Sequence, residues 1–325
     1  MNASVAGIDR VTHIQGLAER VVLRDRAAIG RAITLIENDS AEGAECHRLL
    51  QQHRGKGLVI GITGPPGAGK STLIGAYINL LRRENKTVAV IAIDPSSPLT
   101  GGAILGDRIR MSDHAADDGV FIRSVASRGH VGGLSATVHG VIQVMEAAGY
   151  DVVIVETVGA GQSETEVAQI ADIKVVVMAP GLGDHVQAIK AGILEIADIL
   201  VVNKADSPLA DQAALELRDM LKLRRESARA VAVVKTKAIS AEGLDELAGA
   251  IQHIAGRLAA GGKAARDRDR ARAMLAWAAA ELVRGELINS RSQTVVDLCE
   301  AVTLGKQSLS SAAAALVSPL LERLR

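Results

Sequence analysis

A glycine-rich stretch that ends in lysine and serine is the part of this chain whose residue types and spacing most directly predict chemistry. It reads Gly64-Pro65-Pro66-Gly67-Ala68-Gly69-Lys70-Ser71, which matches the pattern G-x-x-x-x-G-K-[ST] at every fixed position. The glycines let the backbone turn tightly, so that successive N–H groups can face a polyphosphate. Lys70 can reach the β- and γ-phosphates and assist catalysis, Ser71 can offer a hydroxyl to Mg²⁺, and Thr72 continues into a helix whose N-terminal dipole favours an anion. The stretch therefore predicts a phosphate-binding loop rather than a simple turn.

A second motif predicts which base the nucleotide carries. Asn203-Lys204-Ala205-Asp206 follows the apolar run 199–202. Asp206 can accept two hydrogen bonds from N1–H and the N2 amino group of guanine, whereas adenine would leave the carboxylate partly unpaired. The aliphatic stem of Lys204 can cover the face of the ring. Downstream of a phosphate loop, this tetrad indicates GTP and GDP as ligands rather than ATP.

A third segment, Thr236-Lys237-Ala238, follows the apolar run 231–234. At that place a backbone N–H from Lys237 or Ala238 would contact guanine O6.

Three carboxylates are candidates for holding Mg²⁺. Asp94 ends one apolar run, Glu156 ends another, and Asp107 follows a glycine-rich stretch that reads as a mobile loop. A carboxylate at a strand end beside a phosphate loop can bind Mg²⁺ directly or through water. Two alternatives stay open, namely an Asx turn before Pro95 for Asp94 and a solvated charge for Asp107.

Glu156-Thr157-Val158-Gly159 occupies the place of the D-x-x-G element of many GTPases, with glutamate in place of aspartate. Glu156 could reach a metal-bound or attacking water, and the N–H of Gly159 could sense the γ-phosphate. Many small GTPases place a water-orienting glutamine directly after that glycine, but here the next residue is Ala160 and Gln162 comes later. The sequence therefore predicts slow intrinsic hydrolysis and leaves a catalytic role of Gln162 open.

The pattern around these motifs alternates apolar runs with helical stretches. The runs lie at 58–62, 88–93, 120–122, 152–155, 173–178, 199–202 and 231–234. Several are apolar on both faces, as in a parallel sheet covered by helices on both sides, so we predict an α/β fold with βαβ crossovers. Ligands of such sheets bind at the carboxyl ends of the strands, where the phosphate loop, the Asn203–Asp206 tetrad, Asp94 and Glu156 lie. Residues 8–54 are predicted to be helical, with a break and an N-cap at Asp39–Ser40.

Composition excludes several kinds of partner. The net charge is zero and aromatic residues make up 1% of the 325 residues, so we expect neither a nucleic-acid footprint nor a stacking platform. Two distant cysteines indicate a reducing compartment, and the chain has no apolar run of 18 residues. We therefore expect a cytoplasmic protein that binds neither nucleic acid nor membrane.

The last part of the chain predicts a contact between two copies. After a loose break at 256–262, the charged run 263–272 alternates in sign, which is typical of a solvated helix face. Apolar positions then recur at Met274, Trp277, Leu282 and Leu287. An apolar helical stripe needs a partner surface, and a homodimer is the simplest way to supply one. We expect residues 1–55 to form an N-terminal helical extension, 56–255 the nucleotide-binding domain and 256–325 a C-terminal helical dimerisation arm.

The whole string of motifs resembles the MeaB/ArgK family of P-loop GTPases. The segments that carry the resemblance are the phosphate loop, I-D-P-S-S, D-R-I-R-M, R-G-H-x-G-G, E-T-V-G-x-G-Q-S, the P-G-x-G-D loop and N-K-A-D, within about residues 10–290. The resemblance implies a mostly parallel sheet of the signal-recognition and MinD class and a homodimer through C-terminal helices. It also implies a GTPase that gates adenosylcobalamin delivery to methylmalonyl-CoA mutase or a related acyl-CoA mutase and protects or reactivates that enzyme.

The same resemblance assigns roles to the motif residues. It implies that Lys70, Ser71, Asp94, Asp107 and Glu156 serve phosphate and Mg²⁺, and that Asn203, Lys204 and Asp206 hold guanine. The glycine-rich loop 180–190 would be an additional switch facing the mutase. Lys237 departs from the small or apolar residue expected beside Ala238, and the ligand of the loop 128–133 stays open. The alternatives are a metal-insertion GTPase and a protein kinase of a transport system.

Overall fold

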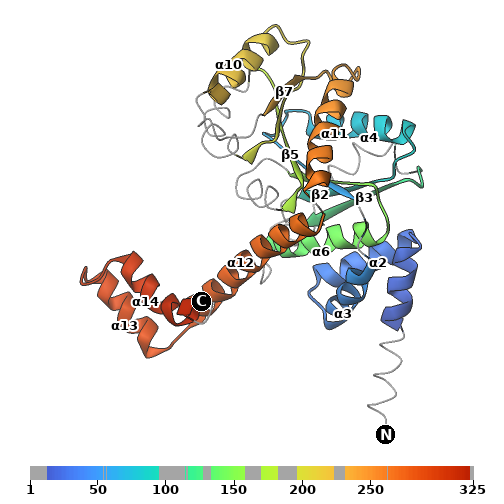
Figure 1. The fold of residues 1–325 in the computed structure, drawn as a ribbon. Helices are drawn as coiled ribbons and strands as arrows, with labels where there is room; N and C mark the ends of the chain where they lie inside the picture. Colours follow the sequence, from blue (N-terminus) through green and yellow to red (C-terminus); the bar gives the residue numbers. More distant parts are fainter. Residues whose placement is uncertain are drawn as a thin grey trace. The chain divides into compact units, whose positions relative to one another are not determined.

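The computed structural model describes residues 13–53, 55, 57–94, 114, 116–126, 133–157, 170–181, 196–222, 231–261 and 263–322. Within them, seven strands form one parallel sheet in the order β3-β2-β4-β1-β5-β6-β7 (Figure 1). The strands are β1 (Leu58–Thr63), β2 (Val88–Asp94), β3 (Val120–Ala126), β4 (Val152–Thr157), β5 (Ile173–Met178), β6 (Ile199–Val202) and β7 (Ala232–Lys235). The predicted parallel α/β sheet is confirmed.

The strand β3 is longer than its apolar run predicts. Arg123 and Ser124 interrupt the run, yet the backbone stays paired with β2 as far as Ala126. The strand can carry Arg123 because its guanidinium forms an ion pair of 2.9 Å with Glu37. A charged side chain with such a partner can therefore lie within a strand that the apolar pattern alone would have ended.

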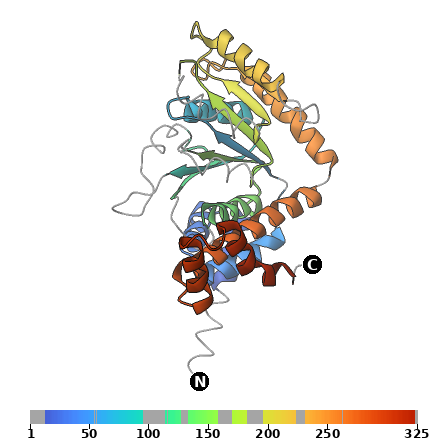
Figure 2. The same ribbon diagram turned by 90° about the vertical axis from the view of Figure 1, so that its left-hand side faces the viewer.

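Helices cover both faces of the sheet (Figures 1 and 2). The helices α4 (Lys70–Arg83) and α11 (Leu244–Ala260) share one apolar core with the side chains of β1 such as Ile60. On the opposite face, α6 (Gly133–Ala147) packs with the N-terminal helices, and α10 (Ala210–Lys222) packs on β5 and β6. Helices thus cover both faces, as the mostly apolar strands require.

The N-terminal helices belong to the core of the sheet. They are a helix over residues 13–22, α2 (Arg26–Glu37), α3 (Ala41–Leu50) and the 3₁₀ turn η1 (Gln51–His53). Ser40 caps α3 by accepting from the N–H of Gly43, so the predicted N-cap is confirmed. A further break at 23–25 was not predicted, because Arg24 adopts the left-handed conformation (φ 63°) without a glycine. Asp25 then caps α2 by accepting from two backbone N–H groups.

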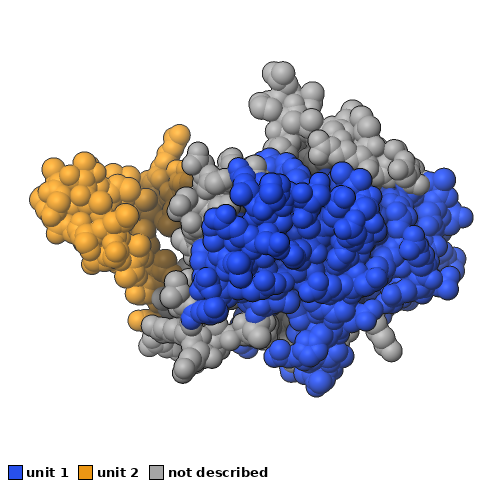
Figure 3. Space-filling view, turned by 90° about the horizontal axis from the view of Figure 1, so that it is seen from above, with its two compact units in different colours: residues 1–275 blue, residues 276–325 orange. Residues whose placement is uncertain are grey.

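The chain divides into two compact units, residues 1–275 and 276–325, which Figure 3 colours separately. The last helices are α12 (Lys263–Asn289), α13 (Gln293–Thr303) and α14 (Leu309–Glu322). The second unit contains an open pocket of about 530 Å³, which we call the C-terminal groove. Its lining includes Leu287, Ile288, Val295, Val296, Cys299 and Leu304. None of the helices in the described part of the chain is long and apolar enough to cross a membrane.

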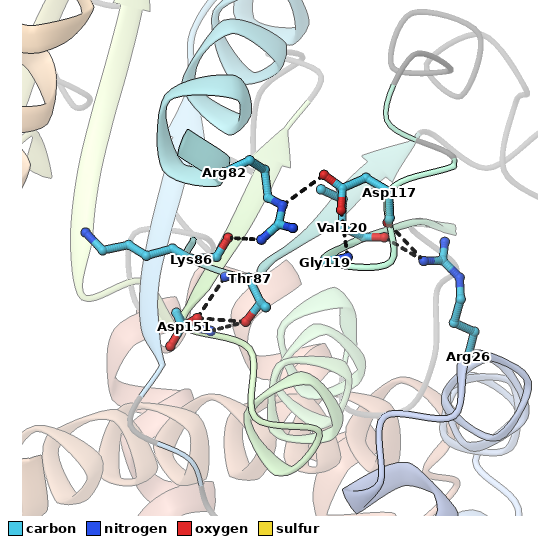
Figure 4. A network of polar contacts seen from close by, with 8 residues as sticks. All are labelled: Arg26, Arg82, Lys86, Thr87, Asp117, Gly119, Val120 and Asp151. Carbon is cyan, nitrogen blue, oxygen red and sulfur yellow. Dashed lines mark hydrogen bonds and ion pairs between the residues drawn. The ribbon is translucent and has the colours of Figure 1, made fainter. Parts of the chain in front are cut away.

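A polar network fixes the chain at the amino ends of the strands (Figure 4). Arg82 donates to the Asp117 carboxylate and to the carbonyl oxygen of Lys86, both at 2.8 Å. Arg26 reaches from α2 to the carbonyl oxygen of Val120, also at 2.8 Å. A Cβ added at Gly119 would lie 2.2 Å from Cζ of Arg82, so only glycine leaves room for the guanidinium. The hydrogen bond from Arg82 holds the pKa of Asp117 below its usual range.

Candidate nucleotide-binding site

Those predicted site residues that the structure describes lie at one edge of the sheet. The phosphate loop follows β1, Glu156 is the penultimate residue of β4, Asn203 follows β6 and Thr236 follows β7. Because these strands are parallel, their carboxyl ends share an edge, and the structure therefore brings together motifs that lie far apart in the sequence.

The phosphate loop is held open by glycines that no other residue could replace without strain. A Cβ on Gly64 (φ 143°) would lie 1.9 Å from the carbonyl oxygen of Val177. Gly69 (φ 88°) precedes the first residue of α4, which is Lys70. The ammonium of Lys70 is buried and donates to the carbonyl oxygens of Gly64 and Pro65, at 2.8 and 3.1 Å. The loop thus holds a positive charge at the N-terminus of a helix, where an anion is favoured.

The two predicted metal ligands Ser71 and Glu156 are in direct contact. The Ser71 hydroxyl donates to Oε1 of Glu156 at 2.8 Å, and both side chains are buried. The pairing of Ile62 with Glu156 between β1 and β4 sets this carboxylate beside the start of α4. A hydroxyl and a carboxylate are oxygen donors of the kind that Mg²⁺ prefers, so this pair fits the cation that the sequence predicts.

The other predicted metal and γ-phosphate contacts are only partly described. Asp94 ends β2, one residue beyond Ile93, which pairs with Thr157, so its backbone reaches the same edge of the sheet. Asp107 and Gly159 lie outside the described residues, as do Gln162 and the loop segments 101–110, 128–132 and 182–190. No group of three or more His, Cys, Asp or Glu side chains that could hold a metal occurs in the part of the chain that the structure describes.

Asn203 connects the phosphate loop to the segment after β7. Its Nδ2 donates to the carbonyl oxygen of Ala68 at 2.9 Å. Its Oδ1 accepts from the Thr236 hydroxyl at 3.1 Å and from the N–H of Ala238 at 3.2 Å. A Cβ on Gly69 would lie 2.3 Å from Nδ2 of Asn203, so the glycine at this position also makes room for the asparagine. One buried carboxamide therefore sets the distance between the two halves of the site.

The remaining residues of the predicted guanine clamp face outward. Asp206 and Lys204 are exposed, and Lys204 adopts the left-handed conformation (φ 58°). The N–H of Ala205 donates to the carbonyl oxygen of Thr236 at 3.0 Å, which fastens the loop to the end of β7. An exposed carboxylate on a fastened loop can accept hydrogen bonds from a ligand.

The segment predicted to contact guanine O6 forms a closed turn. The N–H of Lys237 donates to the carbonyl oxygen of Glu242 at 3.0 Å, and the N–H of Ala238 donates to Asn203. Both N–H groups therefore have acceptors within the protein, so either would have to share its hydrogen with guanine. A contact of Lys237 or Ala238 with the base stays a prediction.

Three threonines complete the site and were not assigned roles from the sequence. Thr236 holds Asn203, and the Thr157 hydroxyl donates to the Thr63 hydroxyl at 2.7 Å, with all three side chains buried. One feature of the sequence could have identified these threonines as site residues. Each is a polar residue at or just past the end of an apolar strand. That signal is weak on its own, since threonine is common in strands.

Comparisons with known proteins identify relatives of this chain. The family model of the methylmalonyl-CoA mutase-associated GTPase MeaB matches residues 29–295. A protein of Pyrococcus abyssi that is provisionally named a GTPase is 50% identical over 72% of this chain and 74% of its own. GTPase ArgK of Escherichia coli is 50% identical over 56% of each chain. The mitochondrial methylmalonic aciduria type A homolog of Mus musculus is 34% identical over 82% of this chain and 71% of its own.

A solved structure is similar over almost the whole chain. The crystal structure of an LAO/AO transport system kinase superposes with a TM-score of 0.70 and 30% identity, covering 95% of this chain and 98% of that one. The similarity thus extends beyond the sheet that carries the site.

Proposed function

The chain belongs to the family of methylmalonyl-CoA mutase-associated GTPases, and from this premise we propose that it uses GTP hydrolysis to serve a cobalamin-dependent acyl-CoA mutase. As a GTPase of this family it converts GTP to GDP and phosphate. The proposed service is to gate the loading of adenosylcobalamin and to protect or reactivate the mutase.

The assignment of GTP as the ligand rests on the contacts that Asn203 makes with two segments of the site. A phosphate loop alone would suit any nucleoside triphosphate, but here the loop is joined through Asn203 to the segment after β7. The hydrogen bonds of Asn203 hold the phosphate loop at a fixed distance from the exposed Asp206. The carboxylate of Asp206 can accept hydrogen bonds from guanine. Lys204 would cover the ring, and Gly64–Thr72 would cradle the phosphates.

The chemistry we propose divides between Lys70 and Glu156. Lys70 neutralises charge on the transferred phosphoryl group, and Glu156 orients the attacking water while it holds the Ser71 hydroxyl. When Mg²⁺ is bound, it supplies further positive charge to the β- and γ-phosphates. Asp94 and Asp107 are proposed as additional oxygen donors for the cation. Because Ala160 stands where many small GTPases carry a glutamine, we propose that hydrolysis is slow until a partner accelerates it.

Two sites are proposed for partners. We assign the loop 180–190 to the mutase, since a partner that orders a loop near the nucleotide can raise the rate of hydrolysis. We assign the C-terminal groove to a second copy of this chain, because its lining is mostly apolar and Ile288 and Leu304 are 71% and 64% exposed.

Both cysteines are free, which fits the reducing environment of the cytoplasm.

The nucleotide assignment is tested by calorimetry. Wild-type protein should bind GTP and GDP and bind ATP weakly, because adenine cannot satisfy Asp206. The variant Asp206→Asn replaces one acceptor with a donor and should shift the preference towards xanthine nucleotides. Equal affinities of the wild type for ATP and GTP would contradict the proposal.

The partner is tested with a GTPase assay in the presence and absence of an adenosylcobalamin-dependent acyl-CoA mutase. We expect the mutase to raise kcat by about 10-fold or more, which corresponds to about 1.4 kcal/mol of the barrier. Binding of GTP and of the mutase must then be reciprocally coupled. The variants Asp184→Ala and Lys190→Ala should lose the stimulation and keep basal hydrolysis. Neither stimulation nor protection of any such mutase would contradict this part of the proposal, and transfer of phosphate to a protein would instead favour a kinase.

A further inference from the structure

Two buried threonines join the phosphate loop to the strand that carries Glu156. Thr63 is the last residue of β1, directly before Gly64, and Thr157 is the last residue of β4, directly after Glu156. The Thr157 hydroxyl donates to the Thr63 hydroxyl at 2.7 Å, and the two residues are 0% and 4% exposed. No role in nucleotide binding that we derived above uses this pair.

The pair lies on the opposite face of the sheet from the Ser71–Glu156 contact. Successive side chains of a strand point to opposite faces, and the pairing of Ile62 with Glu156 brings the next residues, Thr63 and Thr157, together. Glu156 points to the face that α4 covers, where it meets Ser71. The end of β4 is therefore tied to the phosphate-binding segment from both faces by two consecutive residues.

We propose that Thr157 and Thr63 are positioning residues for GTP hydrolysis, which keep the Glu156 carboxylate on the Ser71 hydroxyl. Neither threonine would touch the nucleotide. Strand pairing with β1 and β2 also holds the end of β4, and the hydroxyl pair adds a side-chain contact that limits the remaining shift of β4 relative to β1. Small shifts matter here, because a misplacement of about 1 Å at a reacting group can cost about 100-fold in rate. A variant that removes one hydroxyl leaves the other buried without a partner. Such a variant should lose more folding stability than the double variant, which removes both hydroxyls. The inference rests on the catalytic role proposed for Glu156.

The experiment compares four variants with the wild type: Thr157→Val, Thr157→Ser, Thr63→Val and the Thr157→Val/Thr63→Val double variant. Valine keeps the shape of threonine and removes the hydroxyl, and serine keeps the hydroxyl. We expect Thr157→Val to lower kcat by about 10- to 100-fold while KM for GTP changes by about 2-fold or less, and to raise the Mg²⁺ concentration that gives half the maximal rate. Thr157→Ser should recover most of kcat, and the double variant should be no slower than the slower single variant. The exposed Thr34→Val on α2 is the matched control and should keep the wild-type kcat.

The outcomes separate the inference from the proposed function. A Thr157→Val variant that keeps kcat within about 2-fold, or a Thr157→Ser variant as slow as Thr157→Val, overturns the positioning role. So does a double variant whose loss equals the product of the two single losses, because the pair would then not act as one unit. If Thr157→Val does not fold, Thr63→Val carries the same test. A Glu156→Ala variant with the wild-type kcat overturns both the role of Glu156 and this inference, whereas a slow Glu156→Ala beside a fast Thr157→Val overturns the inference alone.

Discussion

The ammonium of Lys70 lies between two carbonyl oxygens of its own loop, at 2.8 and 3.1 Å. These two acceptors are neutral backbone groups of the phosphate loop. Asn203 likewise makes several contacts, since its single carboxamide contacts four groups from two different loops. At the scale of residues, a few buried polar groups of the described chain position the site, and their partners include backbone, hydroxyl and carboxylate groups.

The first prediction concerns Asn203. Asn203→Ala removes the link between the phosphate loop and the segment after β7 and leaves the Ala68 carbonyl oxygen and the Ala238 N–H without their partner. We expect the free energy of unfolding to fall by about 1–3 kcal/mol and GDP affinity to fall by about 10-fold or more. Urea unfolding and calorimetry measure the two effects. The exposed Asn79→Ala on α4 is the control, and an Asn203→Ala variant with the wild-type affinity would remove the bridging role.

The second prediction concerns the two cysteines. Burial raises the pKa of the Cys46 thiol to about 11, so almost no reactive thiolate forms at neutral pH, whereas Cys299 is exposed. Cys299 lines the C-terminal groove that we assign to a second copy, so a thiol reagent at pH 8 should modify it quickly in protein diluted to monomers and more slowly in the dimer. Cys46 should react only after unfolding. Mass spectrometry of the modified peptides checks the order, and rapid labelling of Cys46 in the native protein would show that α3 opens easily.

At the scale of elements, the apolar runs predicted all seven described strands, because each strand contains an apolar run and most strands are buried on both faces. The motifs likewise predicted Lys70, Ser71, Glu156 and Asn203 as neighbours at one edge. The pattern failed where a tertiary contact decides the local structure. Arg123 continues β3 because Glu37 pairs with it, and nothing in the local sequence shows that partner.

The same limit explains what was missed in the site. The contact between Thr63 and Thr157 depends on β1 and β4 being neighbours in the sheet, although other strands separate them along the chain. Strand order is a property of the assembled sheet, so spacing in the sequence does not reveal it. The N-terminal helices were predicted as helices, but their place in the core of the sheet could not be derived from their periodicity.

The third prediction concerns the polar network at the amino ends of the strands. The hydrogen bond from Arg82 lowers the pKa of Asp117 below 3.8, so the ionised form stabilises the fold above that pH and the contribution is lost as the pH falls through the lowered value. Asp117→Asn should therefore reduce the free energy of unfolding by about 1 kcal/mol or less at pH 7, and the difference should shrink below pH 3.8.

Urea midpoints measured from pH 7 down to pH 3 test this dependence. The neighbouring exposed Asp118→Asn is the matched control. A deficit of Asp117→Asn that stays constant across this range would show that the carboxylate charge does not contribute.

At the scale of the whole molecule, the two compact units differ in where their exposed apolar side chains lie. The first unit buries most of its apolar side chains in cores on both faces of the sheet, and exposed ones such as Leu23, Leu215 and Ile239 lie on separate elements. The second unit leaves large apolar side chains in contact with solvent, several of them along the C-terminal groove. An apolar surface of this kind normally lies in an interface.

The fourth prediction tests that interface. Val296→Glu and Leu304→Glu each place a charge in the C-terminal groove, so we expect dimers to dissociate into monomers that keep basal GTP hydrolysis. Light scattering measures the mass. Leu309→Glu changes an exposed leucine outside the lining of the groove and should stay dimeric. A wild-type protein that is monomeric at micromolar concentration would contradict the proposed dimer.

The position of β7 in the strand order has a consequence for how the nucleotide leaves. Among the described strands β7 is paired only with β6, whereas β1 is paired on both sides, with β4 and β5. The segment predicted to contact the base therefore follows β7, an edge strand that can fray. The phosphate loop follows β1, which is paired on both sides and should fray much less. Fraying frees the base while the phosphates are still held, so release should begin at the base. Amide hydrogen exchange should be faster at Val234, whose N–H faces β6, than at Ile60 and Ile62 in the nucleotide-free protein, and GDP should slow Val234 most. A protein that binds the free side of β7 would then prolong the nucleotide-bound lifetime without touching the nucleotide.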